Sequence, residues 1–218
     1  MITLDDLEFQ LRKVSNRIEE LRWDAQYEVR KKPITVAPKT PEKPQGRDTF
    51  QTPNYAVDLL IPFIPKDVKR VWECAAGGRK ISNRLVYYGY DVYSTDLRDE
   101  VPVNFLTWDL KDQYTYCDAI ITNPPFSIKD LFIERAFEYG FPFALLINSD
   151  YHATHISWIQ RGCEKIIPNR RIDYITPTGR NGKTSSSQFH SMWLTYGFNL
   201  GRTETFVDLP LSWKKERI

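Results

Sequence analysis

The sequence predicts an α/β protein built on an open, mostly parallel sheet. From residue 70 onward, short apolar runs that are typical of strands alternate with longer runs at helical spacing, and this alternation favours a parallel sheet. The chain has 218 residues, of which 41% are hydrophobic and 27% charged. That is enough for one domain with a full core plus an appendage.

The elements follow one another in a regular order. The expected strands and helices are strand 70–74, helix 81–88, strand 91–95, strand 118–122, helix 128–139 and strand 142–147, with two further strands at 191–195 and 203–207. We expect an antiparallel pair near the C-terminus, and a helix through Leu59 and Leu60 ahead of the first strand.

Two segments precede this domain. Residues 1–32 carry a heptad stripe, which predicts either a homodimer through this helix, slightly favoured, or docking on the chain's own domain. Residues 33–48 form a proline-rich basic linker that favours neither helix nor sheet. The third segment, 49–218, is the main domain, and it includes a short basic insertion at about 150–188. The stripe residues are Leu4, Leu7, Leu11, Val14, Ile18 and Leu21.

Composition excludes several classes of protein. No apolar run approaches the length of a membrane span, and the charged N-terminus does not resemble a signal peptide. Three cysteines without paired spacing argue against a disulfide framework or a metal site, and a cytoplasmic location fits them. The net charge of +2 does not by itself indicate nucleic acid, so any such binding must come from local patches.

The most informative motif follows the strand at 118–122. Asn123, Pro124, Pro125 and Phe126 place an amide, a stiff diproline and an aromatic ring in succession. The Asn123 side-chain oxygen and the Pro124 carbonyl can accept hydrogen bonds from an amino group on a flat ring. Phe126 can stack on the face of that ring.

The motif resembles the Asn/Asp-Pro-Pro-Phe/Tyr motif of S-adenosylmethionine-dependent amino-methyltransferases, above all those that methylate adenine in DNA. The resemblance covers about residues 50 to 148, and more loosely residues up to about 207. It implies a Rossmann-like class I methyltransferase fold, S-adenosylmethionine as the cofactor, and DNA as the partner, with RNA less favoured. It also implies base flipping, with Phe126 as the platform of the target base.

The resemblance assigns a cofactor site at the carboxyl ends of the strands. Arg79 stands where the family often has a further glycine, and Asn104 where it often has an acid, for which Asp109 is a nearby alternative. From the residues themselves, Thr52 is expected to cap a helix that has Pro53 in its first turn. The cofactor residues implied are Thr52, Pro53, Glu73, Ala75, Gly77, Asp96, Asn104 and Phe105.

The substrate side is expected between Ser149 and Ser191, a polar and basic stretch that suits phosphate contacts. The segment 188–194 resembles a later motif of the family, and this resemblance makes Phe189 a candidate for lining the target-base pocket, whereas Trp193 is expected in the core. The three histidines are expected to be structural or to face solvent. The candidate phosphate-binding residues are Arg161, Arg170, Arg171, Arg180 and Lys183.

Three alternatives to a DNA adenine methyltransferase stay open. One is methylation of RNA, and a second is methylation of a glutamine amide in a protein, a family whose signature usually ends in tyrosine rather than Phe126. A third is a non-catalytic binding or scaffold module, in which Arg79 disrupts the cofactor site.

Overall fold

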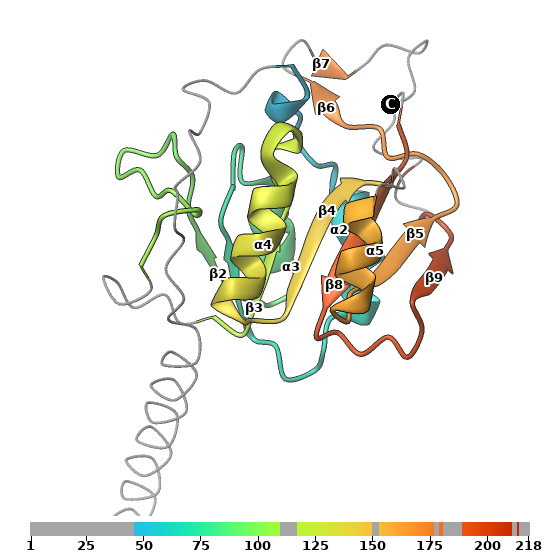
Figure 1. Cartoon of the computed structure of the whole chain (residues 1–218). Coiled ribbons are helices and arrows are strands. Elements are labelled where there is room, and N and C mark those ends of the chain that lie inside the picture. Colours follow the sequence, from blue (N-terminus) through green and yellow to red (C-terminus); the bar gives the residue numbers. More distant parts are fainter. Residues whose placement is uncertain are drawn as a thin grey trace, which may run out of the picture.

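A computed structural model describes residues 46–109, 117–149, 153–176, 179–180, 189–210 and 213. Seven strands form one sheet in the order β2-β1-β3-β4-β8-β5-β9 (Figure 1). The strands are β1 (Arg70–Glu73), β2 (Asp91–Ser94), β3 (Ala119–Thr122), β4 (Phe143–Asn148), β5 (Glu164–Pro168), β8 (Ser191–Tyr196) and β9 (Glu204–Val207). A separate two-stranded sheet pairs β6 (Ile175–Thr176) with β7 (Gly179–Arg180).

The predicted α/β fold is confirmed, because β2, β1, β3 and β4 all pair in parallel. Antiparallel pairing near the C-terminus is also present, where β8 runs against both β4 and β5. The two late strands, β8 and β9, do not pair with each other. Strand β5, which the sequence did not predict, lies between them and is parallel to β9.

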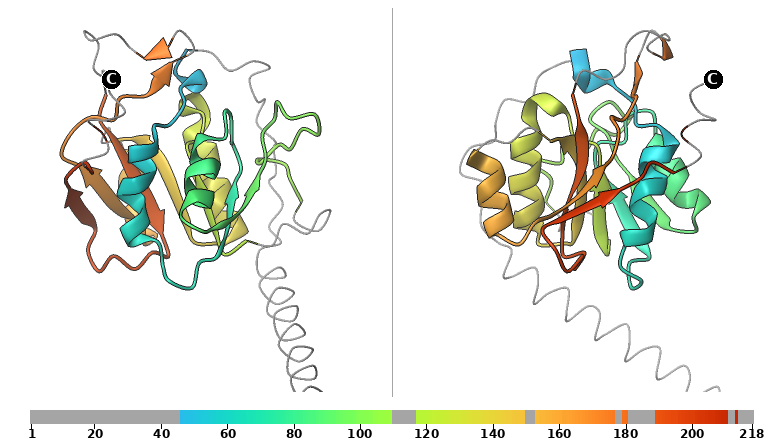
Figure 2. Two further views of the ribbon diagram at one scale, coloured as in Figure 1. Left: turned by 180° about the vertical axis from the view of Figure 1, so that it is seen from behind. Right: turned by 90° about the vertical axis from the view of Figure 1, so that its right-hand side faces the viewer.

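Helices cover both faces of the sheet (Figure 2). Helices α4 (Lys129–Tyr139) and α5 (Ala153–Gln160) lie on one face, and α2 (Asn54–Leu60) and α3 (Lys80–Tyr87) lie on the other. Three short 3-10 helices, η1 (Gly46–Thr49), η2 (Ile61–Phe63) and η3 (Phe126–Ile128), complete the described elements.

The core has two layers because side chains alternate across each strand. In β3, Ile121 packs in the layer beneath α2 and α3, whereas Ile120 packs in the layer beneath α4. Both are fully buried, as a strand in the middle of a covered parallel sheet should be. Trp193 is buried as expected, and its ring N–H donates to the Ala56 carbonyl at 2.9 Å.

Some predictions fall outside the described residues. These are the helix at 1–32, all but the end of the linker, and the insertion residues 150–152, 177–178 and 181–188. The end of the linker belongs to η1 instead of an extended segment. The three cysteines are free and buried, and no helix in the described part of the chain is long and apolar enough to cross a membrane.

Candidate active site

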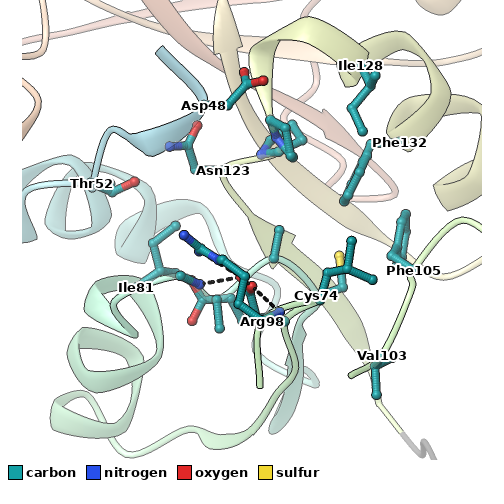
Figure 3. Close-up of a pocket in the computed structure, with 18 of the residues that line it drawn as sticks. Asp48, Thr52, Cys74, Ile81, Arg98, Val103, Phe105, Asn123, Ile128 and Phe132 are labelled. Atoms are coloured by element: carbon teal, nitrogen blue, oxygen red, sulfur yellow. Dashed lines mark hydrogen bonds and ion pairs between the residues drawn. The ribbon is translucent and has the colours of Figure 1, made fainter. Parts of the chain in front are cut away.

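A pocket of about 1080 Å³, which includes space open to solvent, lies beyond the carboxyl ends of β1, β2 and β3. Parallel α/β sheets bind their ligands at this edge. Residues from six separate parts of the chain line the pocket, and Figure 3 shows them converging on one space. They include Thr52, Glu73, Gly77, Asp96, Phe105 and Asn123.

The glycine turn after β1 has the conformation that small residues allow. Gly77 has φ +50°, in the left-handed region that favours glycine. Its amide donates to the Asp96 carboxylate at 2.7 Å, which ties the turn to the end of β2. Arg79 adopts φ +57° just before α3 and pairs with Asp99 at 2.9 Å. The loop therefore keeps a glycine-like path at Arg79 although the glycine is missing.

Asp96 is held as a carboxylate. Burial alone would raise the pKa of Asp96, but hydrogen bonds from the Arg98 guanidinium and from the Gly77 and Arg98 amides outweigh it and lower that pKa. Arg98 approaches the two carboxylate oxygens at 2.8 and 3.1 Å. The guanidinium consequently lies beside the place where ribose hydroxyls are expected to reach Asp96.

Gln51 also covers the glycine turn. Its side-chain oxygen accepts from the Gly78 amide at 2.7 Å, and a Cβ atom added at Gly77 would meet both Gln51 and Arg98 at 3.1 Å. The backbone of Gln51 exchanges two hydrogen bonds with Ile175 in β6, of 2.8 and 2.9 Å. One residue thus contacts both the glycine turn and the expected substrate insertion.

Glu73 lies at the end of β1 with 1% of its surface exposed. Burial raises the pKa of Glu73 from 4.5 to about 7, although hydrogen bonds from the side chain and amide of Ser82 oppose the rise. The Ser82 amide, in the first turn of α3, donates at 2.7 Å. A carboxyl group with a pKa near 7 would lose its proton readily if a cation bound beside it.

Thr52 differs from its expected role as a helix cap. Helix α2 begins one residue later than predicted, so Pro53 occupies the capping position and no side chain caps the helix. The Thr52 hydroxyl is buried without a hydrogen-bond partner and lines the pocket. A buried hydroxyl without a partner is costly, and a bound ligand would satisfy it. Pro53 is buried beside it at the capping position, and it does not line the pocket.

Asn104 and Phe105 form the opposite wall of the pocket. The Asn104 side-chain oxygen accepts from the Leu106 amide at 3.1 Å, so it stabilises its own turn. Phe105 is buried and stacks on Phe132 with ring centres 4.8 Å apart. Phe105 therefore offers an apolar wall, and the alternative acid, Asp109, does not line the pocket.

The Asn-Pro-Pro loop faces the same space. Asn123, Pro124 and Pro125 line the pocket, and the Asn123 side-chain oxygen is buried without a hydrogen-bond partner. Asp48 braces the loop from η1, since its two carboxylate oxygens accept from the amide and the hydroxyl of Ser127. Asp48 and Asn123 both line the pocket, and Figure 3 labels them.

Phe126 points away from this pocket into an aromatic cluster, which consists of Phe50, Phe126, Tyr174 and Phe189. Phe126 meets Phe189 and Tyr174 edge-on, with ring centres 5.2 and 5.8 Å apart. Phe50 belongs both to this cluster and to the pocket wall. Phe189 thus lies beside the Asn-Pro-Pro loop, and its role in lining a target-base pocket stays a prediction.

A solved structure shares this architecture. A protein proposed to be an RNA methyltransferase from Pyrococcus horikoshii aligns over 80% of this chain and 96% of its own, with a TM-score of 0.50 and 14% identity. The fold is that of Rossmann-like methyltransferases. No protein-family model matches the chain, and no curated protein matches it in sequence.

Two other solved structures, both described as methyltransferases, have lower TM-scores. The methyltransferase subunit of a type I restriction-modification system from Streptococcus thermophilus has a TM-score of 0.48 at 14% identity, over 73% of this chain and 47% of that subunit. The chain thus spans about half of that subunit. A precorrin-6y C5,15-methyltransferase from Geobacter metallireducens has a TM-score of 0.36 at 12% identity, over 68% of this chain and 92% of its own.

The structure places the predicted phosphate-binding residues in different parts of this methyltransferase fold. Arg161 follows α5 and pairs with Glu134 at 2.7 Å, so the structure does not bring it to the pocket. Arg170 and Arg171 follow β5 and line a separate hollow. Lys183 lies outside the described residues, and only the backbone of Arg180 is described.

Sequence reasoning missed three polar side chains of the site: Asp48, Gln51 and Arg98. Arg98 could have been suspected because it follows Asp96 by two residues, but no local pattern marks the other two. Among the described residues, no three His, Cys, Asp or Glu side chains gather as a metal site would need.

Proposed function

We propose that this protein transfers a methyl group from S-adenosylmethionine to the exocyclic amino group of adenine in DNA. The observation that carries the proposal is the buried Asn123 side-chain oxygen, which has no hydrogen-bond partner and lies in a pocket lined by Pro124 and Pro125. Buried polar atoms without partners are rare in folded proteins. An amino group entering the pocket would supply the missing donor.

The residues present fit the cofactor. The unpartnered Thr52 hydroxyl and the poised Glu73 carboxyl suit its polar amino-acid part. Asp96 suits ribose hydroxyls, and Phe105 suits the adenine ring. When bound, S-adenosylmethionine supplies a methyl group that is electrophilic without help from the protein.

The chain's own task is mainly one of positioning. The amino nitrogen of adenine is a poor nucleophile because its lone pair is delocalised into the ring. Hydrogen bonds to the Asn123 oxygen and the Pro124 carbonyl would draw its two protons aside and favour a pyramidal nitrogen. These acceptors matter most as the nitrogen forms its bond to the methyl carbon and becomes positive, while the carbon–sulfur bond breaks and a neutral thioether leaves. They therefore stabilise the transition state more than the ground state. The methylated nitrogen then releases one proton to water.

A base can reach this place only after it leaves the stacked duplex. The aromatic cluster borders the Asn-Pro-Pro loop and shares Phe50 with the pocket wall. Its rings offer apolar surface to a base that has flipped out. Phe126 would need to turn from its edge-on contacts to stack face to face, so its first role is to support the loop.

The test compares Asn123→Ala with Asn83→Ala, a control on the exposed face of α3. Cofactor affinity is measured by calorimetry, and transfer of labelled methyl groups is measured on DNA, RNA and protein. We expect both variants to bind cofactor like the wild type, and only Asn123→Ala to lose methylation of DNA, by about a hundredfold.

Three results would contradict the proposal in different ways. Failure of the wild type to bind cofactor would favour a non-catalytic module. Labelling of RNA or of a protein in place of DNA would keep the chemistry and change the substrate. Full activity of Asn123→Ala would remove the assigned role of the loop.

A further inference from the structure

A second hollow lies on the same edge of the sheet as the pocket. Arg170 and Arg171 follow the end of β5, and His190 immediately precedes β8. Because β8 runs antiparallel to both β4 and β5, the start of β8 and the ends of β4 and β5 meet at one edge. Asn123 follows β3, which is parallel to β4, so it lies at that edge too.

The edge therefore carries both the pocket and the hollow. In strand order, the cofactor pocket lies over β2, β1 and β3, and the hollow lies over β8, β5 and β9. Two residues that line the hollow are adjacent in sequence to members of the aromatic cluster, since His190 follows Phe189 and Asp173 precedes Tyr174. The aromatic cluster therefore lies between the hollow and the pocket. Phe189 and Tyr174 both contact Phe126.

The backbone that carries the arginines is fixed to β9. The Asn169 amide donates to the Val207 carbonyl at 2.7 Å, and the Asn169 side chain accepts from the Leu209 amide at 3.3 Å. The Arg170 guanidinium lies 5.5 Å from the ring centre of Trp213, within the range of a cation–π contact. The hollow thus presents a held cation instead of a free surface side chain.

The charges of the hollow suit a phosphodiester. Its lining has two guanidinium groups, from the exposed Arg170 and Arg171, against one carboxylate, Asp173. Guanidinium groups bind phosphate oxygens in a two-pronged geometry. Such contacts fix the register of a nucleic acid strand without reading its sequence.

Resting on the proposed function, we propose that this hollow binds a backbone phosphate of the DNA strand next to the flipped adenine. The aromatic cluster then separates the phosphate site from the Asn123 oxygen, so that the base and its neighbouring phosphate are held at two points. Arg170 and Arg171 act as positioning residues for the substrate, and Trp213 orients Arg170.

The test uses the full chain and a mixed-sequence DNA duplex that the wild type methylates. The double variant Arg170→Ala/Arg171→Ala is compared with Arg161→Ala, whose side chain pairs with Glu134 away from the hollow. We expect the double variant to bind DNA at least tenfold more weakly. We also expect it to reduce the slope of log affinity against log salt by about one for each arginine. Its kcat at saturating DNA and its cofactor affinity should stay within twofold of the wild type, and Arg161→Ala should change nothing.

Arg170→Lys/Arg171→Lys keeps both charges and guards against a folding defect. We expect it to restore the salt slope while recovering only part of the affinity. If the wild type methylates DNA and the double alanine variant has the same DNA affinity and salt slope, this inference is overturned and the proposed function stands. If the lysine variant loses as much salt slope as the alanine variant, the contact is not with phosphate. If the wild type labels no DNA at all, the proposed function itself fails.

Discussion

Asp48 and Ser127 join two segments that are 79 positions apart in the chain, at the mouth of the pocket. The Asp48 carboxylate accepts from the Ser127 amide at 3.1 Å and from the Ser127 hydroxyl at 2.5 Å. Ser127 comes directly after Phe126, and Asp48 lies four residues before Thr52. The contact therefore holds the loop around Asn123 against the segment that leads into the cofactor pocket.

We expect Asp48→Ala to slow methyl transfer roughly tenfold, because the loop acceptors would lose their fixed position. Cofactor affinity should change less than twofold, since Asp48 is braced to the substrate loop. Single-turnover kinetics and calorimetry measure the two effects. The control is Asp67→Ala, an exposed position outside the pocket. A tenfold loss in both variants would show that the brace has no special role.

Gly77→Ala should abolish most cofactor binding, because the added methyl group would enter the turn at a positive φ and within 3.1 Å of Gln51 and Arg98. Gly89→Ala is the matched control, since Gly89 also has a positive φ but has open space around it. Both variants should lose about 1 kcal/mol of stability from backbone strain. Only Gly77→Ala should lose cofactor affinity in calorimetry. Equal cofactor binding by both variants would contradict the assignment of this turn.

Glu73 should make folding depend on pH. Its pKa in the folded protein is about 7, against an ordinary value of 4.5. Below pH 4.5 both states carry the proton, so burial of the group has no ionisation penalty. As pH rises from 4.5 to 7, the unfolded chain releases its proton first and gains stability relative to the folded state. The resulting decrease in the free energy of unfolding levels off above pH 7, at about 3 kcal/mol.

Denaturant unfolding of wild type and Glu73→Gln at pH 5 and pH 8 measures this effect. The variant should be less sensitive to pH, because glutamine does not titrate. Binding of the cationic cofactor should favour the ionised carboxylate, so wild-type affinity should rise with pH up to about 7 and the variant's should not. If the stability of the wild type changes between pH 5 and pH 8 by the same amount as that of Glu73→Gln, the raised pKa is refuted.

Gln51→Ala should increase cofactor affinity about fivefold. The Gln51 side chain accepts a hydrogen bond from the Gly78 amide and covers the turn, so a nucleoside that binds there must displace it. A net hydrogen bond is worth about 1 kcal/mol. Calorimetric titration measures the change. Weaker binding would mean that Gln51 contacts the cofactor directly, which is the opposite of our expectation.

Local chemistry made much of this molecule predictable. Apolar runs such as Ala119–Thr122 identify buried strands because few other structures bury every side chain. Strand β5 escaped because it begins with Glu164 and Lys165, two charged residues in a strand only five residues long. Lys165 is nevertheless buried, and it pairs with Glu204 of β9 at 2.9 Å. Glu204 lies far from Lys165 in the sequence, so a pattern of neighbouring residues cannot predict this ion pair.

The same limit applies to the site. The Asn-Pro-Pro loop and the acid after β2 could be read locally, because each stands at the end of a strand. Asp48, Gln51 and Arg98 depend on folding for their roles. Thr52 was expected to cap a helix, and the structure instead turns its hydroxyl into the pocket. Arg161 resembles the other basic residues in sequence, but α5 carries it to Glu134.

The reversed direction of β8 has a consequence for how such a protein can diversify. The chain leaves the sheet at Asn169 and returns at His190, and both points lie on the same rim. Insertions or exchanges between these two anchors can change what the rim touches without shifting the register of any strand. The connection between β5 and β8 can thus vary independently of the strands whose ends line the pocket.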